Sequence, residues 1–145
     1  MLKPFLLFSA ASLLVLSPAL VQAGASQEAA PAPAASHAGA ANPVKPTPEF
    51  QAKAKSLYAM DCAMCHGDNG NGQTDLTKSM GLNMVDFTNA KAMSAKTDGD
   101  LFDIIRNGKD KMPPEAVGRA NDSMVWNLII YIRNMSKSQP LAPAK

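Results

Sequence analysis

Apolar residues recur at helical spacing in three parts of the chain. The first part has four of them on one helix face, offset by four, seven and eight residues: Phe50, Ala54, Leu57 and Tyr58. Thr47 can act as the N-cap, and Pro48 suits the first helical position because the N–H that it lacks would have no partner there. The pattern predicts a helix from residue 48 to about residue 59, or into the cysteine motif that follows.

Two more helices are predicted nearer the C-terminus. Thr97 to Asp100 fits a capping box, and Asn107-Gly108 is a stop signal. The apolar residues between them are Leu101, Ile104 and Ile105. Asn121-Asp122-Ser123 can cap a last helix, whose apolar surface is broad enough to be buried on more than one side and consists of Val125, Trp126, Leu128, Ile129, Ile130 and Ile132.

Residues 67–96 separate the first of these helices from the second and are rich in Gly, Asn, Asp and Thr. No alternation of apolar and polar residues lasts long enough for a strand, so we predict a long loop with at most short helices. The expected fold class is therefore all-α. A loop of this length is unusual in a small domain unless it wraps a non-protein group, and the pattern thus also indicates a cofactor.

The N-terminal residues have the composition of an export signal. Lys3 precedes an apolar run that ends at Ser17-Pro18, and small residues suited to signal-peptidase cleavage follow. We interpret residues 1–23 as a signal peptide, which places the mature chain in an oxidising compartment, the periplasm if the source is a Gram-negative bacterium. The alternative is an uncleaved membrane anchor, because no charged residue lies between Lys3 and Glu28.

Residues 24–46 contain many Ala and Pro and hardly any large apolar residue. Such a segment cannot bury enough apolar surface to offset the entropy of ordering, so we predict a disordered linker in which His37 is solvated. The folded domain is then expected at residues 47–138, followed by a flexible tail at residues 139–145.

The overall composition excludes several classes of protein. With 46% hydrophobic and 18% charged residues the chain is not wholly disordered, and a formal net charge of +2 is too small for nucleic-acid binding. The chain has 145 residues, which allow one small core. It has two cysteines and two histidines, all of which a closed zinc site would need.

The segment Cys62-Ala63-Met64-Cys65-His66 is a C-x-x-C-H motif in a chain that we expect to be exported. On a helix both thiols lie on one face, where they can add to the two vinyl groups of a haem while the adjacent imidazole reaches the iron. Covalent attachment also explains a cysteine pair in an oxidising compartment. The alternatives are a structural disulfide, a thioredoxin-like redox pair, which expects βαβ patterning, and a metal site.

An iron with one histidine ligand leaves a sixth position open. The candidates are the methionines of the expected mature chain, namely Met60, Met64, Met80, Met84, Met93, Met112, Met124 and Met135. Most of them are expected to fill gaps in the core. Met112 differs because it follows the stop at Gly108 and precedes Pro113-Pro114, which favour an extended conformation and stiffen the loop.

Further segments accompany the motif in a defined order. Leu57-Tyr58 precedes C-A-M-C-H-G, and Asp86-Phe87-Thr88, L-F-D-I-I-R-N-G-K-D-K-M-P at residues 101–113 and W-N-L-I-I-Y-I-R at residues 126–133 follow. Together, over about residues 49–136, they resemble class I c-type cytochromes. The resemblance implies a small all-α fold whose first and last helices cross, with one haem c wrapped by the intervening loops, His66 as proximal ligand and Met112 as distal ligand.

Two features depart from the family's pattern. Ala54 stands where the family commonly has a glycine at the crossing of the terminal helices, so we expect a slightly wider approach there. The family often has a proline whose carbonyl accepts the proximal histidine N–H, but no proline lies between Glu49 and Met112. A carbonyl near residues 83–85 is expected to replace it.

These features predict a monohaem electron carrier, not an enzyme, held covalently to its haem through Cys62 and Cys65. Its expected partners are redox proteins, a dehydrogenase or an oxidase or reductase, and a subunit of a larger oxidoreductase would have the same sequence features. A five-coordinate or ligand-exchangeable haem protein, gas-binding or peroxidase-like, is the other class considered, although the domain offers it no second histidine. We expect an apolar cavity lined by residues around Cys62, His66, Leu101, Ile105 and Met112.

Overall fold

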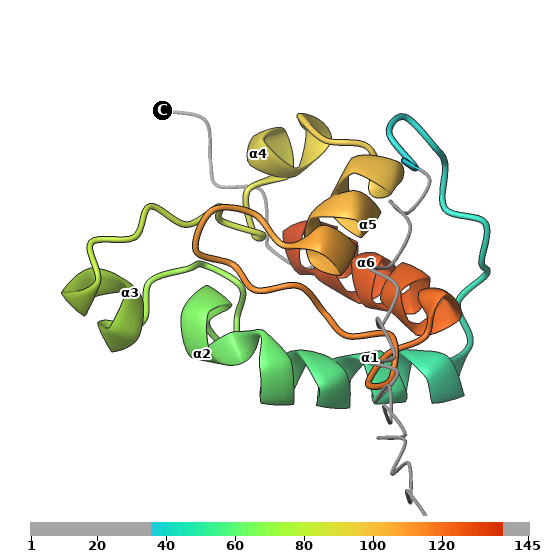
Figure 1. Cartoon of the computed structure of the whole chain (residues 1–145), viewed down its shortest axis with the longest axis horizontal. Helices are drawn as coiled ribbons and strands as arrows, with labels where there is room; N and C mark the ends of the chain where they lie inside the picture. Colours follow the sequence, from blue (N-terminus) through green and yellow to red (C-terminus); the bar gives the residue numbers. More distant parts are fainter. Residues whose placement is uncertain (1–35, 138–145) are drawn as a thin grey trace, which may run out of the picture. The chain divides into compact units, whose positions relative to one another are not determined.

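The computed structural model of the chain describes residues 36–137 (Figure 1). Its helices are α1 (Pro48–Asp61), α2 (Ala63–His66), α3 (Asp75–Ser79), α4 (Ala90–Ser94), α5 (Asp98–Asn107) and α6 (Asp122–Lys137). These residues form no β-strand, and a single isolated bridge joins Lys109 to Met112. The predicted all-α fold is therefore confirmed.

The helix boundaries follow the local signals in the sequence. The hydroxyl of Thr47 accepts from the Phe50 N–H at 3.3 Å, which caps α1 as predicted. At the start of α5, Thr97 and Asp100 each accept from the other's main-chain N–H, which completes the expected capping box. α5 ends at Gly108, which has a φ of 77°. The first turns of α1 and α5 thus have partners for main-chain groups that a helix itself leaves free.

α1 and α6 cross and pack against each other (Figure 1). Ala54 of α1 is fully buried, so the fold accommodates a methyl group where the family commonly has a glycine. Beside it, the side-chain amide of Gln51 donates to the main-chain oxygen and the side-chain oxygen of Asn127 at 3.2 and 3.3 Å. Asn127 is buried on α6, and these bonds provide for its polar groups inside the core.

Aromatic side chains connect α5 and α1 to this helix pair. The ring of Phe102 on α5 stacks on Trp126 with centroids 4.4 Å apart, and both residues are buried. Tyr58 is buried on α1, and its hydroxyl donates to the carbonyl oxygen of Gly67 at 2.7 Å. Trp126 and Tyr58 are therefore core residues, as the helical spacing indicated.

Residues 36–46 pack against the domain, and the prediction of a disordered linker is wrong for them (Figure 1, cyan). The main-chain N–H of His37 donates to both carboxylate oxygens of Asp103, at 3.1 and 2.9 Å. The imidazole Nδ1 lies 3.1 Å from the same carboxylate, and the ring contacts Phe102 and Trp126 at centroid distances of 4.3 and 5.7 Å. His37 is thus half-buried and bound, not solvated.

A glycine in the first turn of α5 makes this close approach possible. A Cβ at Gly99 would lie 1.7 Å from the carbonyl oxygen of His37, so any other residue would displace the segment. The Gly99 N–H donates to Ala40 O at 3.0 Å, and the Asn42 amide donates to Trp126 O at 2.9 Å. The expected signal peptide, residues 24–35 of the expected linker and the expected C-terminal tail lie outside the described residues.

Residues 67–96 form the predicted long connection with short helices. α3 and α4 span five residues each and have a side-chain cap, from Thr74 and Asn89 respectively. Phe87, between them, is buried, and its N–H donates to Gly70 O at 2.8 Å. Through Phe87 the long connection therefore packs on the rest of the domain.

Over residues 36–137, no helix has the length and apolar character needed to span a membrane.

Candidate haem-binding site

A cavity of about 730 Å³ lies between the α1–α2 corner, residues 81–87, α5 and the connection from α5 to α6. Apolar side chains make up most of its lining, among them Leu82, Val85, Phe87, Ala92, Leu101, Ile104, Ile105, Leu128 and Ile132. The residues that the sequence analysis placed around such a cavity all line it, namely Cys62, His66, Leu101, Ile105 and Met112. This prediction is confirmed.

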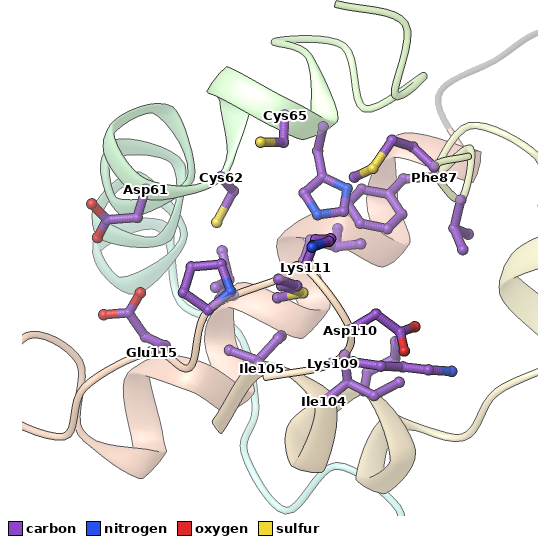
Figure 2. Close-up of a pocket in the computed structure, with 18 of the residues that line it drawn as sticks. Asp61, Cys62, Cys65, Phe87, Ile104, Ile105, Lys109, Asp110, Lys111 and Glu115 are labelled. Carbon is purple, nitrogen blue, oxygen red and sulfur yellow. The ribbon is translucent and has the colours of Figure 1, made fainter. Parts of the chain in front are cut away.

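The C-x-x-C-H motif forms the corner between α1 and α2. Cys62 is both the C-cap of α1 and the N-cap of α2. Its carbonyl oxygen accepts from the N–H groups of Cys65 and His66 at 3.2 and 2.9 Å. Gly67, with a φ of 77°, then turns the chain away. Figure 2 shows the Cys62 and Cys65 side chains directed into the cavity, and both cysteines are free thiols.

The imidazole of His66 lies at the same corner. It stacks on the ring of Phe87, with centroids 4.5 Å apart and an angle of 16° between the planes. Burial lowers the pKa of His66, which favours the neutral ring that a metal ligand needs. Its Nδ1 is buried and has no hydrogen-bond partner among residues 36–137. The expected acceptor, a carbonyl near residues 83–85, thus stays a prediction.

Met112 reaches the cavity from a turn after α5. The main-chain N–H groups of Lys109 and Met112 donate to each other's carbonyl oxygens at 3.0 and 2.8 Å, which closes the turn. Asp110 within it has a φ of 54°, and Gly108 before it makes the left-handed bend. The Met112 side chain is partly buried against the core, and Pro113-Pro114 continue along the cavity. The proline pair therefore lies where the sequence placed it, directly behind the proposed distal ligand.

The structure divides the remaining methionines into two groups. Met60, Met84 and Met93 also line the cavity, and Met93 is almost fully buried. Met64, Met80, Met124 and Met135 do not line it; the first two are mostly exposed, and the last two are partly buried against the core. Met60, Met84 and Met93 therefore remain alternatives to Met112 as the sixth ligand, whereas Met80 lies outside the cavity lining.

Two acidic side chains at the cavity edge were not singled out by sequence reasoning. Asp61 is the last residue of α1, Glu115 follows the proline pair, and Figure 2 shows both side chains on the same side of the cavity. Burial and the nearby Asp61 raise the pKa of Glu115, although Arg119 and Arg106 act in the opposite direction. Burial, with the charges of Glu115 and Asp61, raises the pKa of the Cys62 thiol to about 12. No sequence motif contains both residues, because Asp61 lies at the end of α1 and Glu115 lies in the connection from α5 to α6.

Comparison with known proteins agrees with the geometry. A family model described as cytochrome C oxidase, cbb3-type, subunit III matches residues 49–132, more than half of the chain. The chain belongs to this family of c-type cytochromes. The matched region of this cytochrome contains the C-x-x-C-H corner, the α5 helix and Met112.

Two curated relatives carry the name Cbb3-type cytochrome c oxidase subunit CcoP. The protein from Azospirillum brasilense is 26% identical over 83 residues, which are 57% of this chain and 28% of the relative. The protein from Azospirillum sp. (strain B510) is 29% identical over 87 residues, which are 58% of this chain and 28% of the relative. The cytochrome thus spans less than a third of these relatives. A solved structure, named KustC0563 c-type cytochrome, is 26% identical to this chain. The match covers 57% of this chain and 95% of that protein, with a TM-score of 0.48.

The family implies haem c, and the cavity residues fit that group. Its walls combine an apolar lining with two free thiols, an imidazole and a thioether, which are the donors that c-type haem uses. The stacking of the His66 ring on Phe87 presets the orientation of the imidazole. The assignment of Cys62 and Cys65 to attachment and of His66 and Met112 to the iron remains a prediction.

Proposed function

We propose that this chain is an electron carrier with one haem c, and not itself an enzyme. Cys62 and Cys65 would attach the group through thioethers, and His66 and Met112 would bind its iron. The observation that carries the proposal is that the C-x-x-C-H motif and Met112 line the same apolar cavity, the motif at the α1–α2 corner and Met112 in the turn after α5. When bound there, haem supplies a one-electron iron couple.

The protein residues would then favour electron transfer over substrate chemistry. The mostly apolar lining would limit the access of water to the group, and two protein ligands would leave no position on the iron for a substrate. Met112 is held by a closed turn and by the proline pair, so its sulfur would need little rearrangement between oxidation states. His37, the other histidine of the chain, packs on Phe102 and is not among the cavity residues. A distal histidine for acid–base catalysis is therefore not provided.

The partners would be redox proteins of the exported compartment. The relatives named as subunits of a cbb3-type oxidase favour an oxidase, or a protein that exchanges electrons with one, as one partner. They also support a second candidate function, in which this chain is itself a cytochrome subunit of a larger oxidoreductase. We propose a periplasmic location with residues 1–23 cleaved, and a membrane-anchored form if they are retained.

Replacement of the proposed distal ligand tests this function. Met112→Ala in the haem-loaded protein should turn the oxidised iron at least partly high-spin, lower the reduction potential and allow the reduced form to bind carbon monoxide. Met80→Ala is the matched control, because Met80 is exposed and outside the cavity, and it should behave as wild type. Optical spectra and spectroelectrochemistry report all three effects.

Two results would redirect the proposal. If Met112→Ala keeps the wild-type low-spin spectrum and refuses carbon monoxide, another cavity methionine is the ligand, and Met93 is tested next. If the wild-type protein itself binds carbon monoxide readily, the iron is open and the ligand-binding function replaces the carrier. Size-exclusion chromatography of the periplasmic fraction and of detergent-solubilised membranes from the native host separates a free carrier from an oxidase subunit.

A further inference from the structure

Arg106, near the end of α5, binds the segment that follows Met112 at three points. Its Nη1 donates to the carbonyl oxygen of Glu115 at 2.8 Å, and its Nη2 donates to the carbonyl oxygen of Ala120 at 3.0 Å. The same Nη2 donates to a carboxylate oxygen of Asp122, the first residue of α6, at 2.8 Å. Only 8% of the Arg106 side chain is exposed. One buried guanidinium thus fixes both ends of residues 115–122.

Within this segment, the guanidinium of Arg119 pairs with Asp61 of α1, and the N–H groups of Arg119 and Ala120 donate to the carbonyl oxygen of Ala116 at 3.0 and 3.1 Å. Pro113, Pro114, Ala116, Val117 and Gly118 are exposed, and the next buried side chain is that of Ala120. Its remaining link to α5 is the N–H of Glu115, which donates to Ile105 O at 2.8 Å. The segment is therefore held by hydrogen bonds and not by apolar burial, and most of those that reach α5 come from Arg106.

We propose that Arg106 is the positioning residue for the distal ligand, because by fixing the segment after Met112 it sets how firmly the Met112 sulfur holds the sixth position. This inference rests on the proposed function. A thioether is a weak ligand in competition with water or added ligands, so the conformational freedom that its loop loses on binding decides the outcome. The planar, forked guanidinium reaches three acceptors at once, which an ammonium group does not.

A second arginine makes a matched set of bonds away from the segment that follows Met112. Arg133 of α6 donates through Nε to Asp98 at 2.8 Å, through Nη2 to Lys96 O at 2.6 Å, and through Nη1 to Met93 O. Its side chain is 20% exposed. It resembles Arg106 in the number and kind of its bonds, but it fixes the connection between α4 and α5. Met93 and Lys96 line the cavity, so Arg133→Gln loosens a cavity-lining connection other than the segment after Met112. It therefore controls both for that loosening and for the loss of stability that follows the removal of a largely buried arginine.

The test measures the affinity of the oxidised, haem-loaded protein for added imidazole. Arg106→Gln should bind imidazole about tenfold more tightly than wild type, the order expected from the loss of a charge-assisted hydrogen bond, and should weaken the methionine-to-iron charge-transfer band. Arg133→Gln should lower the thermal midpoint to a similar extent and leave both readouts at wild-type values. Equal effects from the two variants, or none from Arg106→Gln, would overturn the proposal.

A double variant separates this inference from the assignment of Met112. If Arg106 acts through Met112, Arg106→Gln should change imidazole affinity no further in a Met112→Ala background. A full additional effect there overturns the positioning role, whereas wild-type affinity in Met112→Ala alone overturns the ligand. Should Arg106→Gln fail to accumulate, Asp122→Ala removes one of the three bonds at a side chain that is 67% exposed. It should tighten imidazole binding in the same direction by a smaller factor, and no change would count against the proposal.

Discussion

The two walls of the cavity are built in different ways. On the proximal wall, the cysteines and the histidine lie within a five-residue motif, and the helical turn at the α1–α2 corner places them on the cavity side. On the distal wall, Met112 lies in a turn between helices, and its position depends on the left-handed bend at Gly108 and on the bonds that Arg106 makes to residues further along.

The comparison indicates which wall is the more easily disturbed. Hydrogen bonds between neighbouring residues and a helix that packs in the core keep the proximal wall in place. The distal wall depends on residues far apart in the sequence, and few of its side chains are buried. We therefore expect substitutions near Met112 to alter ligand exchange before they unfold the domain, and substitutions in the motif to affect cofactor retention and folding together.

The largest effect is expected when the proximal wall loses both thiols. Cys62→Ser with Cys65→Ser should abolish covalent haem attachment and lower the thermal midpoint by about 10 °C or more, because a domain of this size depends on its cofactor to complete the core. A mass measurement under denaturing conditions detects attachment, and circular dichroism follows melting. Each single variant should retain one thioether. Met64→Ala, within the motif but 69% exposed, should change neither readout.

A double variant whose haem-free form kept wild-type helicity and melting would contradict the dependence on the cofactor. The two walls would then differ only in which iron ligands they provide. An unmodified mass for the wild-type protein, purified from a host that matures c-type cytochromes, would contradict covalent attachment itself.

The sequence predicted the locally determined parts of this structure. Thr47, the Thr97–Asp100 capping box and the stop at Gly108 act through neighbouring main-chain groups, so a short window of sequence contains the whole signal. The cavity-lining set was also predicted, because the resemblance to c-type cytochromes implied one haem between the motif and Met112, and helical spacing placed Leu101 and Ile105 on one face of the helix between them.

The parts that the sequence did not predict depend on contacts between distant residues. The composition of residues 24–46 indicated disorder, but His37 finds a carboxylate 66 positions away and two aromatic rings. Its docking requires the missing side chain of Gly99, which by itself has the appearance of an ordinary helix-start residue. Arg106 stood within a recognised motif, yet its partners in the following connection could be identified only in the folded chain.

A pair of glycines provides a sharper test of the difference between the walls. Gly67 and Gly108 both have a φ of 77°, and alanine at either position adds roughly 1–2 kcal/mol of backbone strain. At Gly108 a Cβ would also lie 2.6 Å from Met112 O and 3.0 Å from Pro114 N, which are main-chain atoms. At Gly67 its nearest neighbours are side-chain oxygens of Asn71 and Asn69 at 3.2 and 3.3 Å, which can rotate away.

Gly108→Ala should therefore cost about 2–4 kcal/mol in unfolding free energy and weaken the methionine-to-iron band, whereas Gly67→Ala should cost about 1–2 kcal/mol and keep the band. Denaturant titration and the oxidised spectrum measure the two effects. Loss of the band in Gly67→Ala, with the band retained in Gly108→Ala, would reverse the assignment of the more sensitive wall.

The smallest effect is expected where the two walls meet, at Asp61 and Glu115. Because burial and Asp61 raise the pKa of Glu115, the folded protein binds that proton more tightly than the unfolded chain does. The stability contributed by Glu115 is then full below its ordinary pKa and is lost as the pH rises through the raised, folded pKa.

Glu115→Gln should raise the thermal midpoint at pH 7 by about 2 °C, and the gain should vanish near pH 4. Glu49→Gln is the matched control, since Lys53 lowers the pKa of Glu49, and it should give no gain at pH 7. If Glu115→Gln instead lowers the midpoint at pH 7, the ion pair of Glu115 with Arg119, at 3.7 Å, outweighs the repulsion from Asp61, and the two walls attract one another at this edge.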